Sequence, residues 1–381
     1  MHENEILSLI SPKIGHLVLN LLQEGYLGLC GAKVKVNELN TSCTTLVAKD
    51  SSCCDRFKIT IPYAGHTITW EVLFDCNYPE APPDFIFGSD DFDFCPDLYS
   101  LQSLVQWDYK DPESLTKVVE ELVYQYRKYQ ENIIAKAQRL QFEYSSLIEL
   151  TDVKSEDIEI QVSKTENRLG PINFLMKLHV DFSRIPAYIV KLDPGEDAAM
   201  LLVTYNSPEG TRITPMVYLS PRVERALGGS SNLRIPGFPT GSCLSEYVPD
   251  VTRLLKNKVD QICQGYEKRK EFVAAFLSMF GRSVLEYDAE SFKKVSFLFE
   301  WNDFFFVIHI DLPALFPKDQ PSLTFQSVYH EYKGQPYIET HQDNYPYSPR
   351  WSGLEMAERI KGFILENIGA FQKQSVISCT T

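Results

Sequence analysis

The chain has 381 residues, of which 44% are hydrophobic and 23% are charged, and its formal net charge is −14. This composition supports packed cores and excludes a largely disordered protein, and the length predicts two or three domains. The acidic charge disfavours nucleic-acid partners and anionic membrane surfaces, and no apolar run approaches the roughly 20 residues of a membrane span.

The nine cysteines are irregularly spaced and form no Cys-x-x-Cys pair, which argues against a zinc ribbon or a dithiol redox motif. An odd number of irregularly spaced cysteines fits reduced thiols better than a set of disulfides. Because thiols stay reduced in the cytoplasm and nucleus, we expect a protein of these compartments. The first residues (MHENEILSLISPK) include acidic side chains and lack the basic start of a secretory signal peptide.

Alternating apolar residues predict two paired strands at 56–63 and 67–74, joined by a turn at Ala64 and Gly65. The segment 77–88 (NYPEAPPDFIFG) predicts a proline-rich crossing and then a short third strand. These elements indicate an antiparallel meander.

A long helix is predicted over 111–148, opening at Asp-Pro-Glu, where Asp suits the N-cap and Pro the first helical position. Apolar residues recur there every three or four positions. An unbroken helix would be about 57 Å long at 1.5 Å per residue. We expect its second half to project toward the next domain or a partner.

The middle of the chain predicts a second pair of strands at 172–182 and 198–205. The charged or turn-rich stretches 151–159 and 163–171 predict the linker before them. A second helix is predicted from Pro249 to Gly281, because glycine favours the position just after the end of a helix.

The last part repeats the order of the first. Strands are predicted at 291–301 and 304–312, followed by a proline crossing and a third strand within 316–327. A helix from Ser352, with Glu355 in a capping box, is expected to fray into the polar tail 372–381. The repetition predicts an α+β protein of three domains: 1–150, 151–281 and 282–381.

The order of meander, Tyr-Pro crossing, tryptophan-bearing loop and closing helix resembles the ubiquitin-conjugating-enzyme fold. Such enzymes place their cysteine after a His-Pro-Asn segment and before the tryptophan. Segment 88–107 has Cys95 but no His-Pro-Asn, and four acidic residues that disfavour a thiolate surround it: Asp90, Asp91, Asp93 and Asp97. We therefore expect catalytically inactive domains of the UEV/RWD type; the alternative is an active conjugating enzyme that uses Cys95.

Two further pairs could begin a metal site, His179 with Asp181 and His309 with Asp311, because strand alternation puts each pair on one face. Neither pair has a third histidine close by, and strand-edge polar residues are the simpler interpretation. The sequence predicts no metal and no cofactor.

Two groups of large apolar residues are candidates for partner contacts, since aromatic side chains dominate binding hot spots. On the predicted long helix they are Tyr129, Ile133 and Tyr144. In the aromatic-proline corner 344–353 they are Tyr345, Tyr347 and Trp351. The alternative for the helix group is that it closes its own domain or docks the next one. The alternative for the corner is that its rings pack against the sheet.

Several long segments of the chain, taken in order, resemble the BRE (brain and reproductive organ-expressed) family: 55–65, 82–88, 193–197, 218–231, 286–290, 309–330 and 344–351. The resemblance implies a non-catalytic scaffold in the BRISC deubiquitinase assembly, which cleaves lysine-sixty-three-linked ubiquitin chains, and in a related DNA-damage complex. It implies three partners: a JAMM-type metalloprotease, an Abraxas-type scaffold and a MERIT-type subunit with a von Willebrand-like fold. Serine hydroxymethyltransferase and ubiquitin chains are further candidates. A free-standing ubiquitin receptor is the other hypothesis.

Overall fold

The structure is a computed structural model that describes residues 3–29, 31–41, 54–75, 77–88, 91, 93–165, 168–192, 197–210, 212–229, 233–342 and 345–379. Asp90, residues 193–196 and 230–231, and position 344 therefore lie outside the described residues. The chain divides into two compact units. The first comprises 1–180, 196–223 and 234–254, and the second comprises 181–195, 224–233 and 255–381.

The first unit begins with two helices and an antiparallel sheet of order β1-β2-β3-β4. The elements are α1 (Glu3–Leu9), α2 (Gly15–Glu24), β1 (Lys35–Asn40), β2 (Arg56–Tyr63), β3 (His66–Leu73) and β4 (Asp84–Ile86). A 3-10 turn and three helices follow: η2 (Leu98–Ser100), α3 (Gln102–Val105), α4 (Ser114–Ile134) and α5 (Gln138–Leu150). Alternate residues of β2 are buried, and this face packs on apolar residues of α2 and α4.

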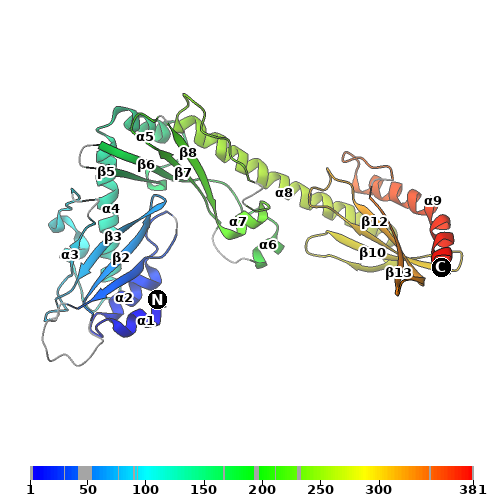
Figure 1. The fold of residues 1–381 in the computed structure, drawn as a ribbon, viewed down its shortest axis with the longest axis horizontal. Coiled ribbons are helices and arrows are strands. Elements are labelled where there is room, and N and C mark those ends of the chain that lie inside the picture. The colour runs from blue at the N-terminus through cyan, green and yellow to red at the C-terminus, as the bar shows by residue number, and fades with distance from the viewer. Residues whose placement is uncertain are drawn as a thin grey trace. The chain divides into compact units, whose positions relative to one another are not determined.

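The same unit contains a second antiparallel sheet of order β5-β6-β7-β8. Its elements are η3 (Ser155–Asp157), β5 (Ile158–Thr165), β6 (Arg168–Lys177), β7 (Ala199–Tyr205) and β8 (Ile213–Leu219). Figure 1 shows α4 running from the first sheet to β5, which it contacts. The beginning of α8 (Leu244–Phe280) also belongs to this unit.

The two sheets of the first unit are joined by buried contacts. The carboxylate of Glu159 on β5 accepts hydrogen bonds from the backbone N–H groups of Leu29 (2.7 Å) and Ala64 (2.8 Å). Glycine is favoured at position 65, where φ is +78° and a Cβ would lie 2.8 Å from the side chain of Leu202 on β7. The core of the first sheet accordingly includes residues of the second.

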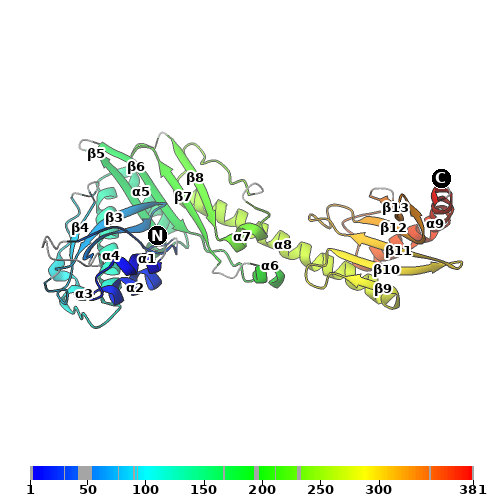
Figure 2. The same cartoon turned by 60° about the horizontal axis from the view of Figure 1, so that its bottom comes forward.

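The second unit contains the rest of α8 and a five-stranded antiparallel sheet of order β13-β12-β11-β10-β9. Its strands, seen side by side in Figure 2, and its last helix are β9 (Val284–Tyr287), β10 (Lys294–Trp301), β11 (Phe304–Asp311), β12 (Ser322–Tyr332), β13 (Gln335–His341) and α9 (Gly353–Cys379). The short elements α6 (Ala187–Leu192), α7 (Pro221–Ala226) and η4 (Gly281–Ser283) complete the described structure. Apolar residues of α8, α9 and one face of the sheet form the core.

The α+β class and most predicted strands are confirmed. The first predicted strand is β2, residue for residue, and it pairs with β3. The expected pairing in the middle of the chain is that of β6 with β7. The three-domain division stays a prediction; the structure places the first two sheets in one compact unit.

The predicted helix over 111–148 is not continuous. It consists of α4 and α5, and the chain is extended at Ala137 between them, with φ −109° and ψ 104°. Leu140 and Leu147 are fully buried in the first unit. The second half, α5, lies against residues of the stretch 151–281, as expected: Glu143 accepts a hydrogen bond from the backbone N–H of Leu244 (2.8 Å). Its contact with a partner stays a prediction.

Three other predicted boundaries are wrong. The expected linker at 151–171 is largely the β5–β6 hairpin, because the alternation in Ile158, Ile160 and Val162 buries one face. Helix α8 begins at Leu244, before the predicted start at Pro249. Helix α9 continues to Cys379, since Ser375 is buried and bonded to His330 (2.9 Å) where fraying was expected.

Candidate interaction surfaces

The three residues predicted as anchors on the long helix lie within the first unit. Ile133 is only 6% exposed. Tyr129 packs beside Phe94, and its hydroxyl oxygen accepts a hydrogen bond from Lys164 Nζ (3.0 Å). Tyr144 donates to Glu131 Oε1 (3.0 Å), and burial raises its pKa above the ordinary tyrosine value. The side chains stabilise α4 and α5, and their contact with a partner stays a prediction.

The aromatic corner is also tied to its own unit. Tyr345 is 5% exposed and donates to the carbonyl of Pro321. Tyr347 donates to the carbonyl of Pro317 (2.6 Å), and burial raises its pKa to about 12. Trp351 is half-buried beneath the guanidinium of Arg359, which lies 5.3 Å from the ring centroid. Their contact with a partner stays a prediction too, with Trp351 and Tyr347 the more accessible rings.

Cys95 is an exposed free thiol. Its acidic neighbours have other contacts: Asp91 accepts from Tyr126 on α4 (2.9 Å), and Asp93 pairs with Lys164 on β5 (3.1 Å). Asp97 accepts from the backbone N–H of Tyr99 at the start of η2. These carboxylates thus hold the segment in place.

Side chains of the two His-Asp pairs make hydrogen bonds and ion pairs within the fold. His179 contacts Asp157 (2.9 Å), whereas Asp181 binds Ser183. His309 lies between Ser296 (2.8 Å) and Gln326 (2.9 Å) on neighbouring strands. In the part of the chain that the structure describes, no three His, Cys, Asp or Glu side chains are grouped to hold a metal ion. Nor does any described helix have the length and apolar content needed to cross a bilayer.

Three strongly exposed aromatic or apolar side chains are further candidates for partner contacts. Tyr99 is 92% exposed, Tyr78 72% and Val105 64%, all within the segment between β3 and α4. Large apolar side chains with this exposure are available to a protein partner. Their sequence pattern resembles that of packed loop residues, so exposure was visible only in the structure.

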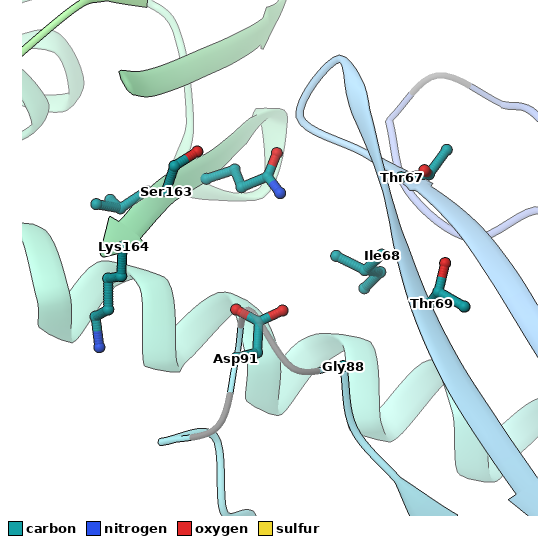
Figure 3. Close-up of a pocket in the computed structure, with 9 residues that line it drawn as sticks. Thr67, Ile68, Thr69, Gly88, Asp91, Ser163 and Lys164 are labelled. Atoms are coloured by element: carbon teal, nitrogen blue, oxygen red, sulfur yellow. The ribbon is translucent and has the colours of Figure 1, made fainter. Parts of the chain in front are cut away.

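A cavity of about 380 Å³ lies in the first unit, at the border of its two sheets. Its lining is mostly polar: Thr67, Ile68, Thr69, Gly88, Asp91, Gln161, Val162, Ser163 and Lys164. Figure 3 shows Ile68 and Thr69 on one side and Ser163 and Lys164 on the other. No sequence pattern marks this cavity, because its walls come from distant segments that only the tertiary fold brings together.

Comparison with known proteins gives a consistent result over the chain. Residues 4–331 match the family model described as "Brain and reproductive organ-expressed protein (BRE)". A protein of Branchiostoma floridae named "BRISC and BRCA1-A complex member 2" is 49% identical over 380 residues, covering 98% of each chain. A protein of Danio rerio with the same name is 48% identical over 374 residues, covering 96% of each chain.

Proposed function

The chain belongs to the BRE family, and from this membership we propose that it is a non-catalytic scaffold subunit of a deubiquitinase complex of the BRISC type. The observation that carries the proposal is similarity over nearly the full length to subunits named for the BRISC and BRCA1-A complexes. Those names describe members of assemblies and mention no catalytic activity, which supports a structural role.

In this proposal the chain bridges a pair of partners to a third. The pair is a JAMM-type metalloprotease, which cleaves lysine-sixty-three-linked ubiquitin chains, with its Abraxas-type scaffold. The third is a MERIT-type subunit. The complex would act in the cytoplasm and the nucleus. The chain would also belong to a second complex, the BRCA1-A assembly, which acts in the response to DNA damage. Serine hydroxymethyltransferase and ubiquitin chains are further proposed partners.

We also propose that the three sheets belong to inactive UEV/RWD-type domains. The antiparallel order β1-β2-β3-β4, followed by helices, supports this for the first sheet, and the antiparallel strands β10 to β13 followed by α9 support it for the last. The domains would act by burying surface, since a specific interface buries about 1,600 Å² in total. The exposed Tyr99 is a suitable contact within such an interface.

Affinity purification of the tagged chain from its own cells, followed by quantitative mass spectrometry, tests the proposal. We expect the metalloprotease, the Abraxas-type subunit and the MERIT-type subunit in near-equal amounts. Tyr99→Ala should reduce recovery of one partner without loss of fold, because the side chain is 92% exposed. Recovery of no such subunit would contradict the scaffold role.

The alternative of an active conjugating enzyme has a separate test. Incubation with ubiquitin, activating enzyme and ATP should yield no thiol-sensitive ubiquitin adduct, and Cys95→Ala should leave complex recovery unchanged. An adduct that is lost on adding thiol and absent from Cys95→Ala would establish the alternative.

A further inference from the structure

Exposed apolar side chains from two segments of the first unit meet at Trp107. Tyr78 is 72% exposed in the loop between β3 and β4, and Val105 is 64% exposed at the end of α3. Trp107 Nε1 donates a hydrogen bond to the carbonyl of Glu80 (3.0 Å), and its ring contacts that of Phe74 (6.3 Å between centroids). Each exposed side chain is two residues from this hydrogen bond. We call the two of them and the half-buried Trp107 the Trp107 surface.

The fold holds both segments of the Trp107 surface in place. In the turn before β4, the N–H of Ala81 donates to the carbonyl of Tyr78 (3.0 Å). Helix α3 is fixed by Glu121 of α4, whose carboxylate accepts a hydrogen bond from the backbone N–H of Gln102 (3.0 Å). A surface that is ordered before binding loses less conformational entropy when a partner arrives.

Negative charge is concentrated in this part of the chain. Between His66 and Lys110 the sequence has nine acidic residues and no lysine, arginine or histidine. The stretch therefore contributes −9 to the net charge of −14, although it has only 43 residues. Such a local excess of one sign attracts partners of the opposite charge.

Four exposed carboxylates lie in or beside the segments that form the surface: Asp75, Glu80, Asp84 and Asp108. No described lysine, arginine or histidine side chain forms an ion pair with any of them. Two basic residues are near: Lys110 follows Asp108 by two residues, and Arg56 of β2 pairs with Leu73 of β3, which pairs with Asp84. The carboxylates outnumber these cations, so the surface carries net negative charge.

We propose that the Trp107 surface docks a partner protein through a patch that is both basic and apolar. A lysine or arginine of the partner lies over the ring of Tyr78 or Trp107 and pairs with Glu80, because aromatic rings and carboxylates both attract cations. An acidic partner would add repulsion, and a neutral one would bury carboxylates without counter-charge. The inference rests on the proposed scaffold role, since it requires a stable protein partner, and it adds the chemistry of one contact.

Carboxylate footprinting tests the inference on the native assembly, purified through the tagged full-length chain. Exposed carboxyl groups are coupled to glycine ethyl ester with a carbodiimide and identified by mass spectrometry. Relative to the free full-length chain, labelling of Glu80 and Asp84 should fall about fivefold or more in the assembly, because the partner covers them. Glu156, whose side chain is 70% exposed, reports any general loss of reactivity. Equal labelling in both samples, or purification of the chain without a partner, would overturn the inference.

Charge variants of Glu80 test the sign of the partner's charge. Glu80→Lys should reduce recovery of one partner by about tenfold or more, and Glu80→Gln by less, because reversal adds repulsion whereas neutralisation only removes attraction. Glu156→Lys is the matched control and should leave recovery unchanged. The side chain of Glu80 is exposed, so the melting temperature should stay that of the wild type. Full recovery with Glu80→Lys would contradict the inference.

Tyr78→Ala tests the apolar part of the contact. It should also reduce recovery of that partner, whereas Tyr124→Ala, at a tyrosine of α4 that is 56% exposed, should not. Equal recovery with the two variants would contradict a role for the ring. Named subunits recovered with unprotected Glu80 would overturn the inference alone. Protection of Glu80 by a protein of another kind would contradict only the proposed function.

Discussion

At the scale of single residues, the side chain of Glu159 links the two sheets of the first unit. It is 3% exposed and accepts hydrogen bonds from two backbone N–H groups, those of Leu29 and Ala64. Glu159→Ala should lower the free energy of unfolding by about 2–4 kcal/mol, because each buried donor left unpaired costs about 1–3 kcal/mol. Urea unfolding measures this. Glu156→Ala is the control, since that side chain is 70% exposed, and an equal loss in both variants would contradict the role.

The same carboxyl group should make stability depend on pH. Burial raises the pKa of Glu159 above its ordinary 4.5, and the N–H groups of Ala64 and Leu29 oppose the shift in part. A raised folded-state pKa contributes stability that is present below pH 4.5 and is lost as pH rises through the folded pKa. Relative to Glu159→Gln, which does not titrate, the wild type should therefore lose stability from pH 4.5 upward. Urea unfolding of both proteins at pH 4.5 and pH 7.5 tests the sign, and a constant difference would contradict it.

Gly65 allows a second contact between the two sheets. Gly65→Ala should cost about 1–2 kcal/mol for the left-handed backbone and further strain against Leu202. Gly241→Ala is the matched control, because its φ is +83° and no atom lies within 4 Å of its Cβ position. Thermal unfolding should show the larger loss at Gly65. Equal losses would mean that Leu202 moves aside freely.

At the scale of elements, α8 depends on a cap from a distant helix. Glu143 of α5 is 3% exposed and accepts a hydrogen bond from the backbone N–H of Leu244, the first residue of α8 (2.8 Å). Glu143→Ala should destabilise the first unit by about 1–3 kcal/mol and speed amide exchange in the first turn of α8. Glu246→Ala, an exposed residue of that turn, is the control. Exchange unchanged by Glu143→Ala would rule out the cap.

This cap explains why sequence periodicity misplaced the start of α8. Pro249 suits a first turn, so the pattern favoured a start there. The helix begins earlier because Glu143 supplies an acceptor and Tyr247 and Val248 are buried. Strand β2, whose own alternation decides its burial, was predicted to the residue, and β3 was predicted to within one residue at each end. Boundaries set by contacts across the chain were not.

The candidate sites show the same difference between features that a local sequence pattern predicts and features that long-range contacts decide. Ile133 and Tyr345 fit the pattern of large apolar anchors, yet each is no more than 6% exposed. Sequence spacing indicates that a residue is apolar and on one face, but not whether its own unit covers that face. The cavity between β3 and β5 had no sequence signal, since Thr67 and Gln161 are ordinary strand residues until the fold brings them together.

At the scale of the whole molecule, the first two sheets should not be separable. Leu175, Met200 and Leu202 of the second sheet are each no more than 7% exposed and belong to the core of the first. A fragment of residues 1–150 loses this cover and the acceptor Glu159. We expect it to melt well below a fragment of residues 1–254 and to bind a hydrophobic dye. Equal melting temperatures would show that the first sheet is self-sufficient.

The position of Glu159 also has a consequence for how the protein is made. Ala64 and its acceptor are 95 residues apart, and Leu29 and the same acceptor are 130 apart. A ribosome adds about 5–20 residues per second, so the acceptor for Ala64 is synthesised about 5–20 s after its donor. During that interval the nascent first sheet has two donors and an apolar face without their final partners. Translation speed between these positions, and the chaperones that hold the growing chain, should therefore influence how much of the protein reaches its native state.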